Sequence, residues 1–134
     1  MKLRTALLTL LAVSSISIVQ AESEQVEDEP IIEERQEQFK RISKSLLSDF
    51  NLAKDSAKNN VENDRQEFSL QVCKMLTNLQ DMLKVSEFYN DLQIAHDTKE
   101  VAEGMLTTVY DMMQFNLISE DSCKYKLYED TIYK

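Results

Sequence analysis

Glycine and proline are almost absent from this chain, since Gly104 and Pro30 are the only ones in 134 residues. The turns of β-hairpins draw on glycine, so this scarcity argues against an all-β fold. Histidine is nearly absent too, with only His96, beside Asp97 in a predicted link between helices. Nucleophile-and-base catalysis and zinc binding both draw on histidine. With no glycine-rich phosphate loop either, we expect a protein that is not an enzyme and holds no metal or cofactor.

Acidic residues outnumber basic ones by 24 to 15, which gives a formal net charge of −9. Nucleic acids and anionic lipid surfaces are polyanions, so a surface this acidic argues against both as partners. The charge favours solubility or a basic protein partner.

The first residues have the three parts of a secretory signal peptide. Lys2 and Arg4 precede an apolar run over residues 6–13, and small residues stand at Val19 and Ala21. A retained anchor is the alternative, but it needs about 20 apolar residues. We therefore predict a signal peptide over 1–21 and a mature chain with a net charge of 13 − 24 = −11. Secretion follows, to the periplasm if the source is bacterial, with no membrane association after cleavage.

Residues 22–29 carry five acids and one sizeable apolar residue, Val26, which predicts an acidic disordered arm. The remaining residues, 30–134, suit one helical domain with one core. Apolar residues at helical spacing predict a first helix from Pro30 to Lys58 and a second within Val61–Leu92. The apolar stripe of that second stretch is Val61, Phe68, Val72, Met75, Leu79 and Met82.

Asn59 and Asn60 predict the break between these helices, and Asn63 with Gln66 resembles a capping box for the second. A single rod of about 90 Å is the alternative. Such a rod would leave its apolar stripe uncovered unless it dimerised.

Asp97 with Glu100 predicts another capping box, which opens a third helix through Val101, Met105, Val109 and Met112. Gly104 within it costs about 1 kcal/mol relative to alanine and permits close approach of another backbone. Ser119 predicts the N-cap of a fourth helix, with Ile118 and Cys123 in the positions of a hydrophobic staple. We expect the core-facing residues of this helix to be Leu127, Tyr128 and Ile132.

The two cysteines of a secreted chain predict a disulfide, Cys73–Cys123, with reduced thiols or an intermolecular bridge as alternatives. Closing a loop of 123 − 73 = 50 residues stabilises the fold by about 4 kcal/mol in the chain-entropy model. The bond would draw the start of the fourth helix towards the middle of the second. The expected fold is therefore an all-α, skewed, antiparallel four-helix bundle.

Two stretches are candidate binding surfaces. Methionine is adaptable at interfaces, and the third helix carries Met105, Leu106, Tyr110 and Met113, for which a place in the bundle centre is the alternative. Tyrosine recurs in protein interfaces, and Tyr125, Tyr128 and Tyr133 lie near the end of the chain, where a frayed amphipathic helix is the alternative.

Leu76-Thr77-Asn78-Leu79-Gln80 resembles the LTxxQ motif of the Spy/CpxP family of helical periplasmic chaperones. The resemblance covers five residues. In that family the motif recurs and helps begin a helix, whereas here it occurs once, inside a predicted helix. We therefore transfer no chaperone activity from it.

The expected function is that of a secreted, non-enzymatic binding protein, monomeric or weakly dimeric. It would act as an inhibitor that occupies the surface of an extracellular host protein, such as a complement or coagulation component. Its architecture is similar to that of small helical salivary or venom proteins. The alternatives are a periplasmic chaperone-like or toxin-immunity protein, and a carrier of a small apolar ligand.

Overall fold

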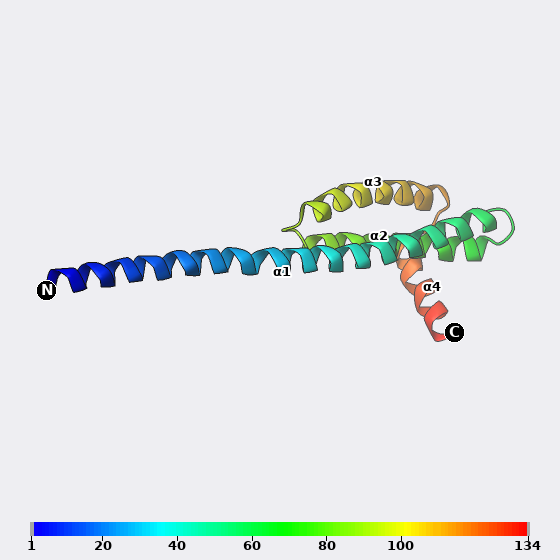
Figure 1. Ribbon diagram of the computed structural model, residues 1–134. Helices are drawn as coiled ribbons and strands as arrows, with labels where there is room; N and C mark the ends of the chain where they lie inside the picture. Colours follow the sequence, from blue (N-terminus) through cyan, green and yellow to red (C-terminus); the bar gives the residue numbers. More distant parts are fainter. Residues whose placement is uncertain (1, 134) are drawn as a thin grey trace. The chain divides into compact units, whose positions relative to one another are not determined.

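The computed structural model describes the backbone of residues 2–133 and the side chains of residues 31–133. Four helices make up this backbone, with no strand among the described residues (Figure 1). They are α1 (Lys2–Asn60), α2 (Arg65–Phe88), α3 (Gln93–Phe115) and α4 (Glu120–Ile132). The predicted all-α fold is confirmed.

The chain divides after Glu37 into two compact units, and α1 contributes to both. Side chains of residues 1–30 lie outside the described part, so the signal peptide (1–21) and the acidic arm (22–29) stay predictions. The predicted first helix, residues 30–58, falls within the longer α1. Both core clusters lie in the second unit, Gln38–Lys134.

The break at Asn60 is confirmed, and α1 and α2 form a hairpin rather than one rod. The turn is closed by the backbone N–H of Asp64, which donates to the carbonyl oxygen of Asn60 at 3.0 Å. The N-cap of α2 is Asp64 and not the predicted Asn63, because its carboxylate accepts from the backbone N–H groups of Gln66 and Glu67, each at 3.0 Å. Val61, predicted to lie on the apolar stripe of this helix, is instead 54% exposed in the turn.

The main core is built on α2, against which both α3 and α4 pack. Every predicted stripe residue of α2 from Phe68 to Met82 is buried in it. Neighbouring helices contribute Phe50, Ala53 and Ala57 from α1, Ala102, Val109 and Met113 from α3, and Cys123 from α4. A second cluster of Phe39, Tyr89, Leu92 and Ala95 closes the end of the unit near the α2–α3 turn.

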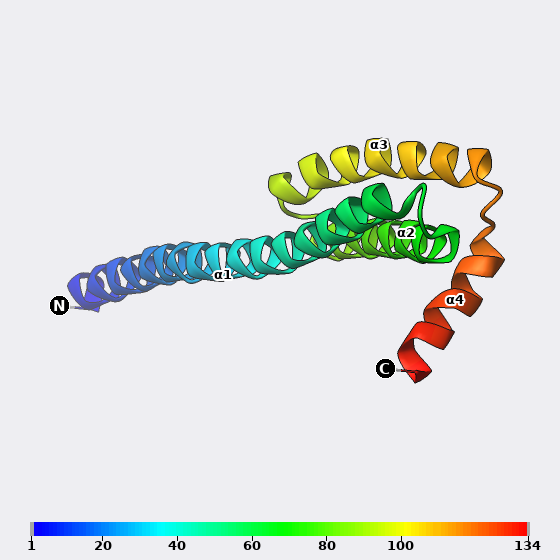
Figure 2. The ribbon, with the colours of Figure 1, turned by 90° about the vertical axis from the view of Figure 1, so that its right-hand side faces the viewer.

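Cys73 and Cys123 form the predicted disulfide, with their Cα atoms 5.1 Å apart. The Lys74 ammonium adds a 3.0 Å ion pair to the Asp130 carboxylate of α4. Figure 2 shows α3 running alongside α2, whereas α4 leads away from both. The bundle is therefore skewed, as predicted.

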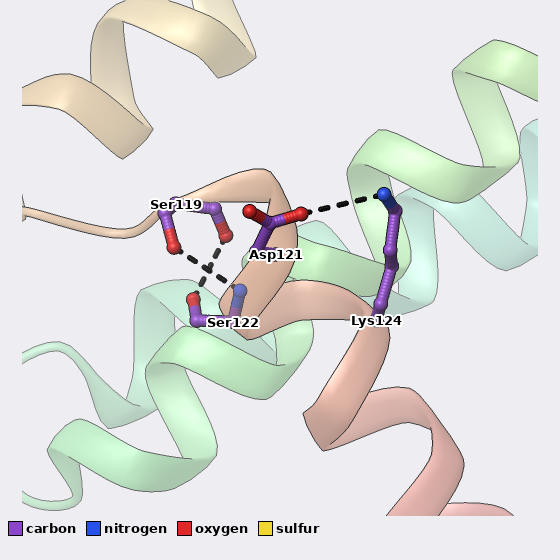
Figure 3. A network of polar contacts seen from close by, with 4 residues as sticks. All are labelled: Ser119, Asp121, Ser122 and Lys124. Carbon is purple, nitrogen blue, oxygen red and sulfur yellow. Dashed lines mark hydrogen bonds and ion pairs between the residues drawn. The ribbon is translucent and has the colours of Figure 1, made fainter.

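The start of α4 is also confirmed in detail (Figure 3). The Ser119 hydroxyl accepts from the backbone N–H of Ser122 at 3.1 Å, and the Ser122 hydroxyl donates to the Ser119 carbonyl at 2.8 Å. Asp121, in the first turn, forms a 3.4 Å ion pair with Lys124. Ile118 packs against the main core that holds Cys123, as the staple predicts.

Two expectations about side chains of α3 and α4 are wrong. Gly104 approaches no other backbone, since a Cβ built on it would meet nothing within 4 Å. Tyr128 and Ile132 are exposed, and of the three predicted core residues of α4 only Leu127 packs against the core. The reason is that the side of α4 with Cys123, Leu127 and Asp130 faces α2, so Tyr128 and Ile132 are left in solvent.

Candidate functional site

The described residues hold no cluster with the ligands of a metal site. Among residues 31–133, no three histidine, cysteine, aspartate or glutamate side chains lie close enough to hold an ion. His96 is exposed and lies in the first turn of α3, not in a link as predicted, because that helix already begins at Gln93. None of the helices, over the residues searched, is long and apolar enough to cross a membrane.

The candidate residues of α3 form one wall of the main core. Met113 is only 3% exposed and packs inside it, whereas Met105, Leu106 and Tyr110 are half-buried against it. Burial raises the pKa of the Tyr110 phenol above its ordinary value, and a hydrogen bond with the Glu120 carboxylate raises it further. This stretch therefore serves packing along most of its length.

The candidate tyrosines of α4 are all exposed, and two of them line a groove. This tyrosine groove has a volume of about 550 Å³ and lies between the start of α2 and α4. Its lining residues are Asp64, Gln66, Glu67, Leu70, Tyr125, Lys126, Glu129, Asp130 and Tyr133. Tyr128 does not line it.

The tyrosine groove is acidic, with four carboxylates and one ammonium among its lining side chains. Lys74, just outside it, pairs with one of these carboxylates, that of Asp130. A hydrogen bond with the Glu129 carboxylate raises the pKa of the Tyr125 phenol above its ordinary value. Aromatic rings among carboxylates suit a cationic side chain, because both attract positive charge.

A third surface is the turn between α3 and α4, which we call the apolar turn and define as Phe115–Leu117. Its two apolar side chains, Phe115 and Leu117, are 88% and 89% exposed. Leu117 has a φ of 58°, the only positive φ among the described non-glycine residues. The left-handed conformation is costly for a residue with a Cβ, and glycine or asparagine usually takes it at the end of a helix.

The backbone of the apolar turn is that of a Schellman motif. The N–H of Ile118 donates to the carbonyl oxygen of Met113 at 2.9 Å, and the N–H of Leu117 donates to that of Gln114 at 3.2 Å. Ile118, which follows the left-handed residue, packs against the core cluster that contains Met113. Residues on both sides therefore fix the conformation at Leu117.

The sequence pattern singles out neither Phe115 nor Leu117 as a candidate site residue. The available signal was the absence of glycine after the last helical turn, in Phe115-Asn116-Leu117-Ile118. Because no glycine follows α3, its Schellman ending puts a residue with a Cβ in the left-handed region.

Comparison with protein-family models, with curated proteins and with solved structures finds no match for this chain.

Proposed function

We propose that this is a secreted, non-enzymatic binding protein that acts by occupying the surface of an extracellular protein. The observation that carries the proposal is the apolar turn, where two large apolar side chains face solvent and one of them sits on left-handed backbone. Leu117 buries almost nothing within its own chain, yet its backbone costs about 1–2 kcal/mol relative to glycine. Backbone strain of this kind clusters at functional sites, where the stability that it costs is offset by the function that it serves.

The apolar turn is also well fixed in place, which favours binding. The Asn116 side-chain amide donates to the Met112 carbonyl at 2.8 Å, and the Arg65 guanidinium donates to the Asn116 carbonyl at 3.3 Å. A few residues further on, Cys123 is cross-linked to α2. A turn whose backbone is already fixed in this way loses less entropy on association than a flexible one.

The charge of the tyrosine groove supports a basic partner. Its carboxylates and tyrosines would bind lysine or arginine side chains, while Phe115 and Leu117 fill an apolar pocket of the same partner. A complement or coagulation component, with the protein as its inhibitor, is the kind of extracellular target that we propose.

Secretion is part of the proposal and has its own test. A disulfide persists in oxidising compartments, and residues 1–21 have the pattern of a signal peptide. Amino-terminal sequencing of the exported protein is expected to begin at Glu22. Finding the protein only inside the cell, with Met1 retained, would contradict secretion.

The binding site is tested by site-specific photo-cross-linking. Leu117 is replaced by p-benzoylphenylalanine, the full exported protein is mixed with the extracellular fluid of its source, and the sample is irradiated. The matched control carries the same replacement at Phe88, which is an exposed aromatic residue in the last turn of α2, at the other end of that helix from Arg65. We expect an adduct with one protein at 117 and none at 88.

The adduct then identifies a partner whose affinity can be measured. Phe115→Ser and Leu117→Ser should each weaken its binding by about tenfold or more, as anchor residues of interfaces do. Glu129→Gln should weaken it less, and mainly at low salt. Equal adducts at 117 and 88, or unchanged affinity in both serine variants, would refute the proposal.

A further inference from the structure

We propose that the groove between α1 and α3 binds a small neutral amphiphile, meaning an apolar chain with a hydroxyl group at one end. The groove has a volume of about 500 Å³. Its lining residues are Lys40, Ser43, Lys44, Leu47, Met82, Asp97, Thr98, Val101 and Met105. The proposal is independent of the apolar turn and of the tyrosine groove.

The groove lies where a regular bundle would have its fourth helix. Both α1 and α3 flank α2, and Met82 of α2 forms the floor between them. A regular four-helix bundle would lay α4 over this floor. Here the disulfide holds the start of α4 at Cys73, which is nine residues or about 14 Å along α2 from Met82. Leu47 and Val101 stay 42% and 61% exposed on the two walls.

One end of the groove is apolar and adaptable. Leu47 and Val101 form the walls there, Met105 is half-buried against the core, and Met82 is buried in the floor. Methionine has three rotatable bonds and a polarizable sulfur, so such a surface adjusts to ligands of different shape. An apolar chain fits it because burying apolar surface is favourable and needs no hydrogen-bond partner.

The charged side chains of the groove favour neither an anion nor a cation. Lys40 already interacts with a partner. The charges of Lys44 on α1 and Asp97 on α3 cancel, and the Asp97 carboxylate also accepts from the Gln93 side-chain amide at 2.9 Å. An ionic ligand would lose hydration on entering and gain no net attraction in return. The groove therefore suits a neutral ligand.

Three hydroxyl side chains gather at the end of the groove next to the second core cluster. They are Ser43 on α1, four residues after Phe39; Ser86 on α2, three residues before Tyr89; and Thr98 on α3, three residues after Ala95. Residues three or four apart share one face of a helix. Since α1 and α3 run in the same direction and α2 runs back (Figure 1), the three side chains lie at one level, one turn from the cluster.

The Ser86 hydroxyl is buried without a hydrogen-bond partner among the described residues. Its side chain is only 2% exposed, and an unpaired buried hydroxyl costs stability. Ser86 lies one turn from Met82 on the same face of α2, so it continues the floor of the groove beneath Ser43 and Thr98. A polar ligand group that reaches it past the flexible Met82 side chain restores the missing hydrogen bond.

The hydrogen bonds already made at this end decide which polar group fits. The Ser43 hydroxyl donates to the Phe39 carbonyl at 2.8 Å. The Thr98 hydroxyl donates to the Ile94 carbonyl at 2.7 Å. Both can therefore only accept a further bond, whereas Ser86 can donate or accept. An alcohol does both as well, while a carboxylate or an ether has no donor and an ammonium has no acceptor.

The size of the groove favours a small ligand over a helix of another protein. Its lining runs from Lys40 to Leu47 on α1 and from Asp97 to Met105 on α3, which is about 10–12 Å. A helix docked in a groove uses anchors over two turns or more, and a stable protein interface buries about 1,000 Å² or more. A volume of about 500 Å³ is instead within the range of small-molecule sites.

The test titrates the full, oxidised protein with 1-octanol by isothermal calorimetry. Heptyl methyl ether is the matched comparator, because it is an isomer of 1-octanol that has no hydroxyl donor, and octanoate and octylammonium are the charged comparators. We expect saturable binding of one 1-octanol, about two- to tenfold tighter than the ether and tighter than either ion. Equal affinity for 1-octanol and the ether, or no saturable binding of 1-octanol, would overturn the proposal.

Two pairs of variants locate the two ends of the ligand. Ser86→Ala should abolish the preference for 1-octanol over the ether, whereas Ser69→Ala, at another buried serine of α2 outside the groove, should keep it. Val101→Glu puts a carboxylate in the apolar end and should lower the affinity for 1-octanol by about tenfold or more. Val61→Glu, at an exposed valine between α1 and α2, should leave that affinity unchanged.

Folding is checked in each variant by circular dichroism and by the intact disulfide. Ser86→Ala should unfold at a higher urea concentration than wild type, because it removes the unpaired hydroxyl. A full preference for 1-octanol in folded Ser86→Ala, or equal affinities of Val101→Glu and Val61→Glu, would overturn the proposal. Dimers in sedimentation that Val101→Glu abolishes, together with no binding of 1-octanol, would assign the groove to a second copy of the chain instead.

Discussion

Replacing Leu117 with glycine should make the protein more stable, although the substitution deletes a large apolar side chain. At a φ of 58° the Cβ of Leu117 comes too close to the following carbonyl oxygen, and glycine has no Cβ. The deleted side chain is 89% exposed, so almost no burial is lost with it. Both hydrogen bonds of the Schellman motif use backbone atoms and persist in the variant.

The size of the effect follows from two opposing contributions. Relief of the left-handed conformation contributes about 1–2 kcal/mol. The greater freedom of glycine in the unfolded chain offsets about 0.4–1 kcal/mol of this. The free energy of unfolding should therefore rise by about 0.5–1 kcal/mol, which raises Tm by about 2–8 °C for a domain of this size.

Urea unfolding followed by far-ultraviolet circular dichroism measures this difference directly. Leu117→Ala is the control, because alanine keeps the Cβ and should unfold within about 0.5 kcal/mol of wild type. Leu117→Asn should fall between alanine and glycine, since asparagine tolerates this conformation better. If the glycine variant were no more stable than the alanine variant, the turn would not be strained, and the argument from strain to binding would fail.

Three further predictions concern stability. Cys73→Ser should lower the free energy of unfolding by about 4 kcal/mol, because it opens a loop of 50 residues, while the helix content stays largely intact; melting like that of the oxidised wild type would contradict this. Gly104→Ala should raise the free energy of unfolding by about 1 kcal/mol, since the added Cβ meets nothing within 4 Å. A lower free energy of unfolding for this variant, measured by urea unfolding, would contradict the prediction. The raised pKa of Tyr110 means that the fold favours the neutral phenol, so this contribution to stability is complete below the usual value of 10.0 and is lost as the pH rises through the raised value. The alkaline loss should be smaller in Tyr110→Phe, as measured by urea unfolding across that pH range.

Local chemistry was enough to predict the parts of the fold that depend on neighbours in sequence. Ser119 caps α4 because serine accepts from the backbone N–H three residues on, wherever the helix lies. The apolar stripe of α2 was readable for the same reason, since periodicity is a property of the segment itself. The disulfide followed from a count of two cysteines in a chain with a secretory leader pattern.

Contacts between distant segments account for what was missed. The third helix was predicted to open at Asp97 on the evidence of Glu100, yet it begins at Gln93 with no side-chain cap on Leu92. Leu92 and Ala95 are buried with Phe39 of α1 and Tyr89, and this packing fixes the first turn of α3 instead. The sequence around Asp97 does not indicate that Phe39 packs there. Tertiary packing therefore decided where α3 begins, in place of the local capping pattern.

The placement of α4 decides whether the floor between α1 and α3 is covered. The spacing of apolar residues predicts that Val101 lies on the apolar face of its helix. It does not predict which helix covers that face. Because the disulfide joins the first turn of α4 to the middle of α2, a helix of 13 residues, about 20 Å long, ends away from the start of α3. The groove between α1 and α3, over Met82 of α2, stays open for that reason. The same cross-link that stabilises the fold therefore leaves this groove uncovered.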